Sequence, residues 1–158
     1  MPGLFGVLNL ESLNSEQFQE SKQLFSAMAN SLCHHDDDIV DESVLFDGRI
    51  LIGRIGLAHQ NLISWPEVYS GEHIHTTVFP AGALLETNTP KVKNGFPNRS
   101  NLRHWQGIYA ALVHEPRSGK SLIIADRKAS VPIYYTKVQN QLIFAPEIKA
   151  LLANPKVS

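Results

Sequence analysis

The sequence has little cysteine, little charge and no excess of basic residues. Its one cysteine, Cys33, excludes a disulfide within the chain, and this is typical of proteins from a reducing compartment such as the cytoplasm. Charged residues make up 18% of the chain, and 14 basic side chains stand against 15 acidic ones, so the formal net charge is −1. Because no overall basic field is present to hold phosphates, we do not expect nucleic acid as a partner.

Long hydrophobic runs and targeting signals are missing as well. No apolar run approaches the roughly 18 residues of a membrane span. The apolar first ten residues lack both a basic region and a small-residue cleavage pattern, so no signal peptide is indicated. We therefore expect a cytoplasmic protein that makes no membrane contact. Its 158 residues suit a single domain with one hydrophobic core.

The first third of the chain changes from a strand pattern to a helix pattern. Residues 4–10 form a short apolar run and predict a buried strand. Over residues 13–32 the apolar side chains recur at helical spacing, which predicts an amphipathic helix. Asn14 is the expected N-cap, and Gln17 stands where a capping box needs it.

The middle of the chain predicts antiparallel strands followed by a long loop. Two apolar runs within residues 43–63 surround Asp47-Gly48, a dipeptide that favours two-residue hairpin turns. Residues 73–79 alternate and are β-branched, so they predict another strand. Residues 87–106 contain two prolines, several asparagines and few aliphatic side chains, and therefore predict a loop.

The last third is the most regular part. Four strands are predicted, at residues 107–114, 121–127, 132–138 and 141–146. Turn signals separate them, and one or two amphipathic helical turns follow at residues 147–155. Strand, helix, many strands and helix is the order of an α+β domain whose antiparallel sheets are covered by helices.

The stretch ADRKASVPIYYTKVQNQLIFAPEIKALL resembles the end of the glutamine amidotransferase domain of the asparagine synthetase family. The family pattern there is Asp-Arg, then Pro-Leu-Tyr-Tyr, a hairpin, and Phe-Ala-Ser-Glu-Ile-Lys-Ala-Leu. Upstream, the first strand and the run GRILIGRIGLAHQNL resemble the family as well. The matching residues that we consider structural are Gly3, His59, Asp126, Arg127, Pro132, Tyr134, Tyr135, Glu147 and Lys149.

The resemblance implies a fold and a partner. The fold is the four-layer αββα sandwich of N-terminal nucleophile (Ntn) hydrolases, formed by residues 1–158 as one class II glutamine amidotransferase-like domain. In this family an ATP-dependent synthetase domain follows, so we expect such a domain in the same chain or as a separate partner. ATP and Mg²⁺ are implied for that synthetase part, and no cofactor is implied for this domain. A homodimer is a further option.

The position of the family nucleophile differs in this chain. In the family, the mature amino terminus is a cysteine whose thiol attacks the glutamine amide, with its own α-amine as base. Here the chain begins Met1-Pro2-Gly3, so the matching position, Pro2, carries neither a thiol nor a hydroxyl. Cys33 cannot take over this role, because it lies at the end of the predicted helix and has no α-amine of its own.

Other family positions differ too. The arginine that would clamp the substrate carboxylate falls at Asn61. The Asn-Gly-Glu motif of the oxyanion site is replaced by a segment that begins with Pro80, Ala81 and Gly82. The segment that carries the acidic partner of the substrate amine is replaced by the predicted loop. We therefore predict a degenerate pocket and a domain that does not hydrolyse glutamine, kept as a structural or regulatory part of an amide-forming ligase.

Two other functions remain open on the sequence alone. The amine of Pro2 could act as a base, as in tautomerases, or a degenerate pocket could serve a stand-alone binding module. The proline could also simply begin a strand.

The remaining polar clusters have plain structural explanations. The run from His34 to Asp38 contains metal-ligand residue types, but we expect a solvated loop and no metal. His73 and His75 share a strand face without an obvious third ligand. Asp126 and Arg127 suggest an ion pair or a turn network at a strand end. Of Tyr134 and Tyr135, we expect one in the core and one on the surface.

Overall fold

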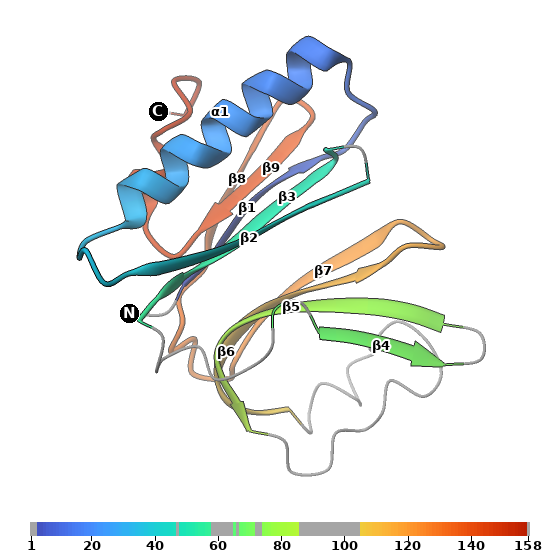
Figure 1. Cartoon of the computed structure of the whole chain (residues 1–158), viewed down its shortest axis with the longest axis vertical. Coiled ribbons are helices and arrows are strands. Elements are labelled where there is room, and N and C mark those ends of the chain that lie inside the picture. The colour runs from blue at the N-terminus through green and yellow to red at the C-terminus, as the bar shows by residue number, and fades with distance from the viewer. Residues whose placement is uncertain are drawn as a thin grey trace.

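The computed structural model describes residues 3–46, 48–57, 65, 67–71, 74–85 and 105–157. Two antiparallel sheets pack face to face, and a long helix covers the outer face of one of them (Figure 1). Sheet A has the order β2-β3-β1-β9-β8, with β1 Gly3–Asn9, β2 Ile39–Leu45, β3 Ile50–Gly56, β8 Tyr134–Val138 and β9 Gln141–Ala145. Sheet B has the order β4-β5-β6-β7, with β4 Glu67–Gly71, β5 Ile74–Leu85, β6 Gln106–Glu115 and β7 Lys120–Ala125.

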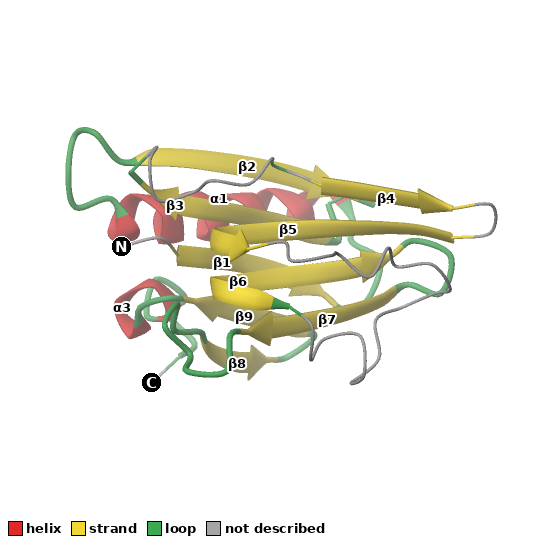
Figure 2. Ribbon diagram, turned by 90° about the horizontal axis from the view of Figure 1, so that it is seen from below, coloured by secondary structure: helices red, strands yellow, loops and turns green. Residues whose placement is uncertain are grey.

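Strand β1 lies in the centre of sheet A and is buried along its whole length. Its odd residues Phe5 and Val7 pack toward helix α1, Ser15–Leu32, whereas Leu4 and Leu8 pack toward sheet B. A strand covered on both faces needs apolar side chains at every position, which explains the continuous apolar run in the sequence. Figure 2, seen from the side of sheet B, shows the strands of both sheets with α1 behind them.

Helix α1 begins with the predicted capping box. The Gln17 amide N donates to Asn14 Oδ1 at 2.8 Å, and the Asn14 amide N donates to Gln17 Oε1 at 3.0 Å. The helix packs Phe25 against Phe5 with ring centroids 5.0 Å apart, and it ends at Cys33, whose side chain is exposed. The predicted helix is therefore confirmed at both ends.

The β2–β3 hairpin differs from its prediction in two ways. Strand β2 begins at Ile39, four residues before the start of the predicted apolar runs at residue 43, and Leu45 pairs with Ile50. The connection is thus four residues long instead of two, and the Arg49 amide N donates to Phe46 O at 3.0 Å. The polar residues of β2 are compatible with a strand because β2 is an edge of sheet A, where one face and one side remain in contact with water.

Sheet B extends beyond the predicted strands. Strand β4 was not predicted, and β5 continues six residues past the expected end at residue 79. The outer face of sheet B carries a buried cluster of Val78, Tyr109, Ala111 and Val113. In the described ranges no helix covers this face, so the confirmed architecture is an α+β sandwich of one helix layer and two sheets. The fourth layer stays a prediction, because residues 86–104 lie outside the described residues.

The last third of the chain agrees with the prediction. Strands β6, β7, β8 and β9 appear at the predicted places, and α3, Ile148–Leu151, is a single helical turn. Helix α3 buries Ala150 and Leu151 against the cluster beneath α1.

Among the helices of the described residues, none is long and apolar enough to cross a membrane.

Candidate functional site

The start of β1 is where the family resemblance places the site, and Gly3 fits it for a packing reason. Gly3 pairs with Ile55 of β3, and a Cβ atom at Gly3 would lie 2.5 Å from Pro146 Cγ. A larger residue would therefore displace the chain that follows β9. Pro2 itself lies outside the described residues, as do His59, Asn61 and His73. The predictions for these four positions remain predictions.

Next to the start of β1, Arg54 projects from β3 into the space between the two sheets. Its side chain is 8% exposed, Nε donates to Asp41 Oδ2 at 2.7 Å, and the guanidinium lies 5.2 Å from the centroid of the Trp65 ring. A buried guanidinium is stable only with such partners. Sequence reasoning missed this residue, although a lone arginine in the apolar run ILIGRIG was a signal that a partner must exist.

Arg54 also connects sheet A to the segment that replaces the family oxyanion motif. Its Nη1 donates to Pro80 O at 3.3 Å. Strand β4 pairs with β5 only as far as Val78, so Pro80 lies beyond the end of β4. A proline there breaks no bond to β4, and its carbonyl is satisfied by Arg54 instead.

Pro80, Ala81 and Gly82 lie within β5, whereas we expected them after a strand. Ala81 is fully buried in the cluster between the sheets. Gly82 has φ 95°, and a Cβ there would lie 2.3 Å from the carbonyl oxygen of Ile108. The predicted degenerate segment is thus a buried strand. Its residues line neither of the two cavities described below, both of which lie on the α1 side of sheet A.

Asp126 organises the turn after β7. Its carboxylate accepts hydrogen bonds from the amides of Lys128 at 2.8 Å, Ser130 at 2.9 Å and Tyr109 at 3.3 Å. Burial acts to raise the pKa of Asp126, but these hydrogen bonds outweigh burial and hold the pKa below its ordinary value. The turn network is confirmed. In the described part of the chain, Arg127 makes no ion pair with Asp126.

The expectation for the two tyrosines is wrong. Tyr134 is 44% exposed and Tyr135 is 73% exposed, so neither is a core residue. Their strand, β8, is an edge of sheet A and follows the half-buried Pro132. An edge strand has one neighbour only, and its side chains are correspondingly less covered.

Glu147 and Lys149 meet His34 beside the start of β1. His34 Nε2 lies 2.7 Å from Glu147 Oε1, and Lys149 Nζ lies 3.4 Å from Glu147 Oε2. The hydrogen bond from His34 is the main cause that holds the pKa of Glu147 below its ordinary value. His34 and Glu147 border a cavity of about 120 Å³ that Ile55 and Pro146 also line.

The polar run His34–Asp38 uses its side chains for local structure. Asp38 Oδ2 accepts from the amides of His34 at 2.9 Å and His35 at 3.0 Å, while the His34 ring faces Glu147. The described residues contain no group of three or more His, Cys, Asp or Glu side chains arranged to hold a metal ion.

His114 is a second residue that the sequence did not single out. It lies on β6 between the sheets and is 3% exposed, and Nδ1 lies 2.9 Å from Ser121 Oγ. Its ring packs against Phe46 at 4.5 Å. Nε2 is buried and has no hydrogen-bond partner among the described residues. Burial, with a contribution from the charge of Arg49, lowers the pKa of His114.

We expect His114 to make the fold sensitive to mild acid. The unfolded chain takes up a proton near the ordinary histidine pKa of about 6.5, and the folded chain only at lower pH. The free energy of unfolding should therefore fall as the pH decreases from about 6.5 toward the pKa of the folded state. His114→Phe should remove this part of the decline, as followed by urea unfolding at pH 8, 7, 6 and 5. The control is His35→Phe at an exposed position. An unchanged decline in His114→Phe would contradict the assignment.

The comparisons with known proteins agree with the family indicated by the sequence. Residues 96–158 match the family model described as a glutamine amidotransferase domain. The chain is also 22% identical, over 98% of its length, to "Asparagine synthetase [glutamine-hydrolyzing] 2" of Bacillus subtilis (strain 168). It spans 23% of the length of that relative. The chain is therefore similar to a glutamine amidotransferase domain over residues 96–158 and, along its length, to part of an asparagine synthetase.

Proposed function

We propose that this chain is a glutamine amidotransferase-like domain that no longer hydrolyses glutamine and that serves an asparagine-synthetase-like ligase as a structural or regulatory part. The observation that carries the proposal is Pro2, at the position of the family cysteine and directly before Gly3. The close approach of Gly3, the first residue of β1, to Pro146 is a packing reason for glycine at this position and supports the match with the family start.

The chemistry of proline supports the loss of activity. The family route requires the nucleophile to form an intermediate that water can hydrolyse more easily than the substrate amide. If the Pro2 amine attacked the glutamine side-chain carbonyl and released ammonia, the product would be a tertiary amide. That amide is no easier to hydrolyse than the amide of the substrate, so the enzyme would not turn over.

The substrate-binding positions support the same conclusion. Asn61 is neutral and cannot form the paired ionic contact of an arginine with a carboxylate. Pro80 has no N–H, and its carbonyl accepts from Arg54, so this part of β5 is engaged in joining the sheets. These features favour a domain that has lost glutamine binding and is retained for a structural role.

The partner that we propose is an ATP-dependent synthetase. It would bind ATP and Mg²⁺, activate a carboxylate, and take nitrogen from free ammonia or from an amine of its substrate. It would lie in the same polypeptide or in a second chain. The similarity to a synthetase more than four times as long as the matched region is the support for this arrangement.

We expect that Pro2→Cys alone will not create a glutaminase. The thiol would be restored, but Asn61 would still leave the substrate carboxylate unpaired. The measurement is the release of glutamate and ammonia from glutamine, with Pro2→Ala as the matched control, and the two variants should be indistinguishable.

Three results would contradict the proposal. Glutamine hydrolysis by the wild-type chain that Pro2→Ala abolishes would show a working amino-terminal catalyst. Turnover of an enolisable keto acid that is lost when one residue is added before Pro2 would identify Pro2 as a base. Thermal stabilisation by glutamine without turnover would instead favour a binding module.

A further inference from the structure

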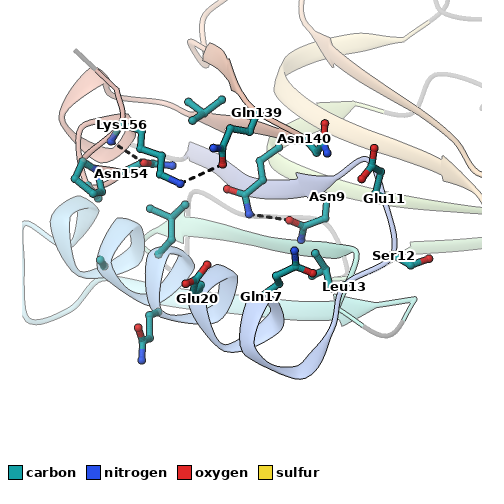
Figure 3. A pocket seen from close by; sticks show the side chains of 17 residues that line it. Asn9, Glu11, Ser12, Leu13, Gln17, Glu20, Gln139, Asn140, Asn154 and Lys156 are labelled. Carbon is teal, nitrogen blue, oxygen red and sulfur yellow. Dashed lines mark hydrogen bonds between the residues drawn. The ribbon is translucent and has the colours of Figure 1, made fainter.

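A larger cavity, of about 750 Å³, lies at the other end of β1 from Gly3. It is an open groove between α1, the β8–β9 turn and residues 153–156 (Figure 3). Its volume is within the range of ligand sites in proteins, about 300–1,000 Å³. We call it the amide groove, because side-chain amides from all of these segments line it. Six of them are Asn9, Gln23, Gln139, Asn140, Gln141 and Asn154.

The floor of the amide groove is a buried network with a fixed orientation. Asn9 is 5% exposed, its Nδ2 donates to Gly48 O at 3.0 Å, and its Oδ1 accepts from Gln141 Nε2 at 2.8 Å. Gln141 Nε2 also donates to Ser21 Oγ at 2.9 Å, and Ser21 Oγ donates to Asn9 Oδ1 at 3.2 Å. The amide nitrogen of Gln141 is thus engaged within the network, which fixes the orientation of this side chain.

The rim of the groove adds charge and apolar contact. Among the described lining residues, Glu11 and Glu20 are carboxylates and Lys156 is the ammonium group. Lys156 Nζ donates to Gln139 Oε1 at 3.1 Å and is thereby held at the rim, as Figure 3 shows. The formal charge of the lining is therefore −1. Leu24 and Val138 supply apolar surface.

These features together fit one kind of ligand. Several of the lining amides are engaged within the protein, namely Asn9, Gln139, Gln141 and Asn154. The side chains of Gln23 and Asn140 would therefore meet a ligand with a donor and an acceptor side by side, which is the pattern that an extended peptide backbone presents in return. Apolar side chains between the amides can hold alternate side chains of such a peptide. The carboxylates of Glu11 and Glu20 favour a basic side chain on it. A helical segment fits less well, because its backbone groups are already paired with one another.

We propose that the amide groove binds an extended segment of a partner polypeptide that carries a basic residue. The proposal is independent of the loss of glutaminase activity, since the groove and the start of β1 lie at opposite ends of the strand.

The test uses an array of short random peptides probed with the fluorescently labelled full chain. Captured peptides should be enriched in lysine and arginine. Capture should fall by about tenfold or more in the double variant Gln23→Ala with Asn140→Ala, because each lost amide contact is worth on the order of 1 kcal/mol. The matched control is Gln19→Ala, an exposed amide of α1 that does not line the groove.

A charge reversal sharpens the experiment. Glu20→Lys should weaken the capture of basic peptides and shift the selection toward acidic ones. Thermal unfolding of every variant checks that the fold is kept. Three outcomes would overturn the proposal. The double variant and Gln19→Ala could capture peptides equally well, the captured peptides could lack an excess of basic residues, or the array could show no selection at all.

Discussion

Replacement of Gly82 by alanine is expected to lower the free energy of unfolding by about 3–5 kcal/mol. Two causes act together. The backbone at Gly82 has φ 95°, a conformation that residues with a Cβ rarely adopt. The new Cβ would also lie 2.3 Å from the carbonyl oxygen of Ile108, a backbone atom of the neighbouring strand β6. That oxygen cannot move away without disturbing the pairing of β5 with β6. Urea unfolding followed by circular dichroism measures the loss as a lower midpoint at an unchanged slope.

Gly119→Ala is the control that separates the two causes. Gly119 also has a positive φ, 68°, but no heavy atom lies within 4 Å of a Cβ built there. This variant should therefore lose only about 1 kcal/mol, from the backbone conformation alone. If Gly82→Ala is no more destabilising than Gly119→Ala, the close approach of β5 to β6 is not as described.

Asp126→Ala is expected to lower the free energy of unfolding by about 3 kcal/mol at pH 7. The residue is 8% exposed, and its carboxylate serves the amides of Tyr109, Lys128 and Ser130 as well as the Ser130 hydroxyl at 3.2 Å. Alanine leaves these donors without their acceptor, and the hydrogen bond from the Tyr109 amide is a buried one. Asp126→Asn keeps one acceptor oxygen, so its loss should be about half as large. The exposed neighbour variant Arg127→Ala should change stability by no more than about 0.5 kcal/mol.

The contribution of Asp126 should disappear in acid. Its pKa in the folded state is below the value of about 3.9 that it has in the unfolded chain. The stabilisation is therefore complete above about pH 5 and is lost as the pH falls through the folded pKa. The difference between wild type and Asp126→Asn should be constant from pH 8 to pH 5 and should shrink below about pH 4. A difference that grows on acidification would mean that the carboxylate is not the stabilised form.

Local sequence patterns predicted those elements whose structure depends on residues close together in the chain. The capping box at Asn14 and Gln17 involves residues three positions apart, and the apolar run of β1 records burial on both faces. The start of β2 could not be read in the same way. Its polar residues are compatible with a strand because β2 lies at an edge of sheet A. The order of strands in a sheet cannot be predicted from a short stretch of sequence.

The candidate site shows the same division. Gly3 and Asp126 were singled out through the family pattern, and the structure supplies their physical reasons, a close approach to Pro146 and a turn network. The exposure of Tyr135 and the partners of Arg54 depend on contacts between segments far apart in the chain. Such contacts follow from the arrangement of whole elements, and the periodicity of apolar residues does not predict them.

The central place of β1 in sheet A has a consequence for the order of folding. Its two neighbours are β3 and β9, and the bond between Asn9 and Gln141 joins residues 132 positions apart. Closing so long a loop is entropically costly and slow. During synthesis, β1 therefore leaves the ribosome long before β9 exists to cover its second edge. Until then, a strand that is apolar except for Asn9 has one unpaired side, and we expect the nascent chain to be most prone to aggregation in this interval.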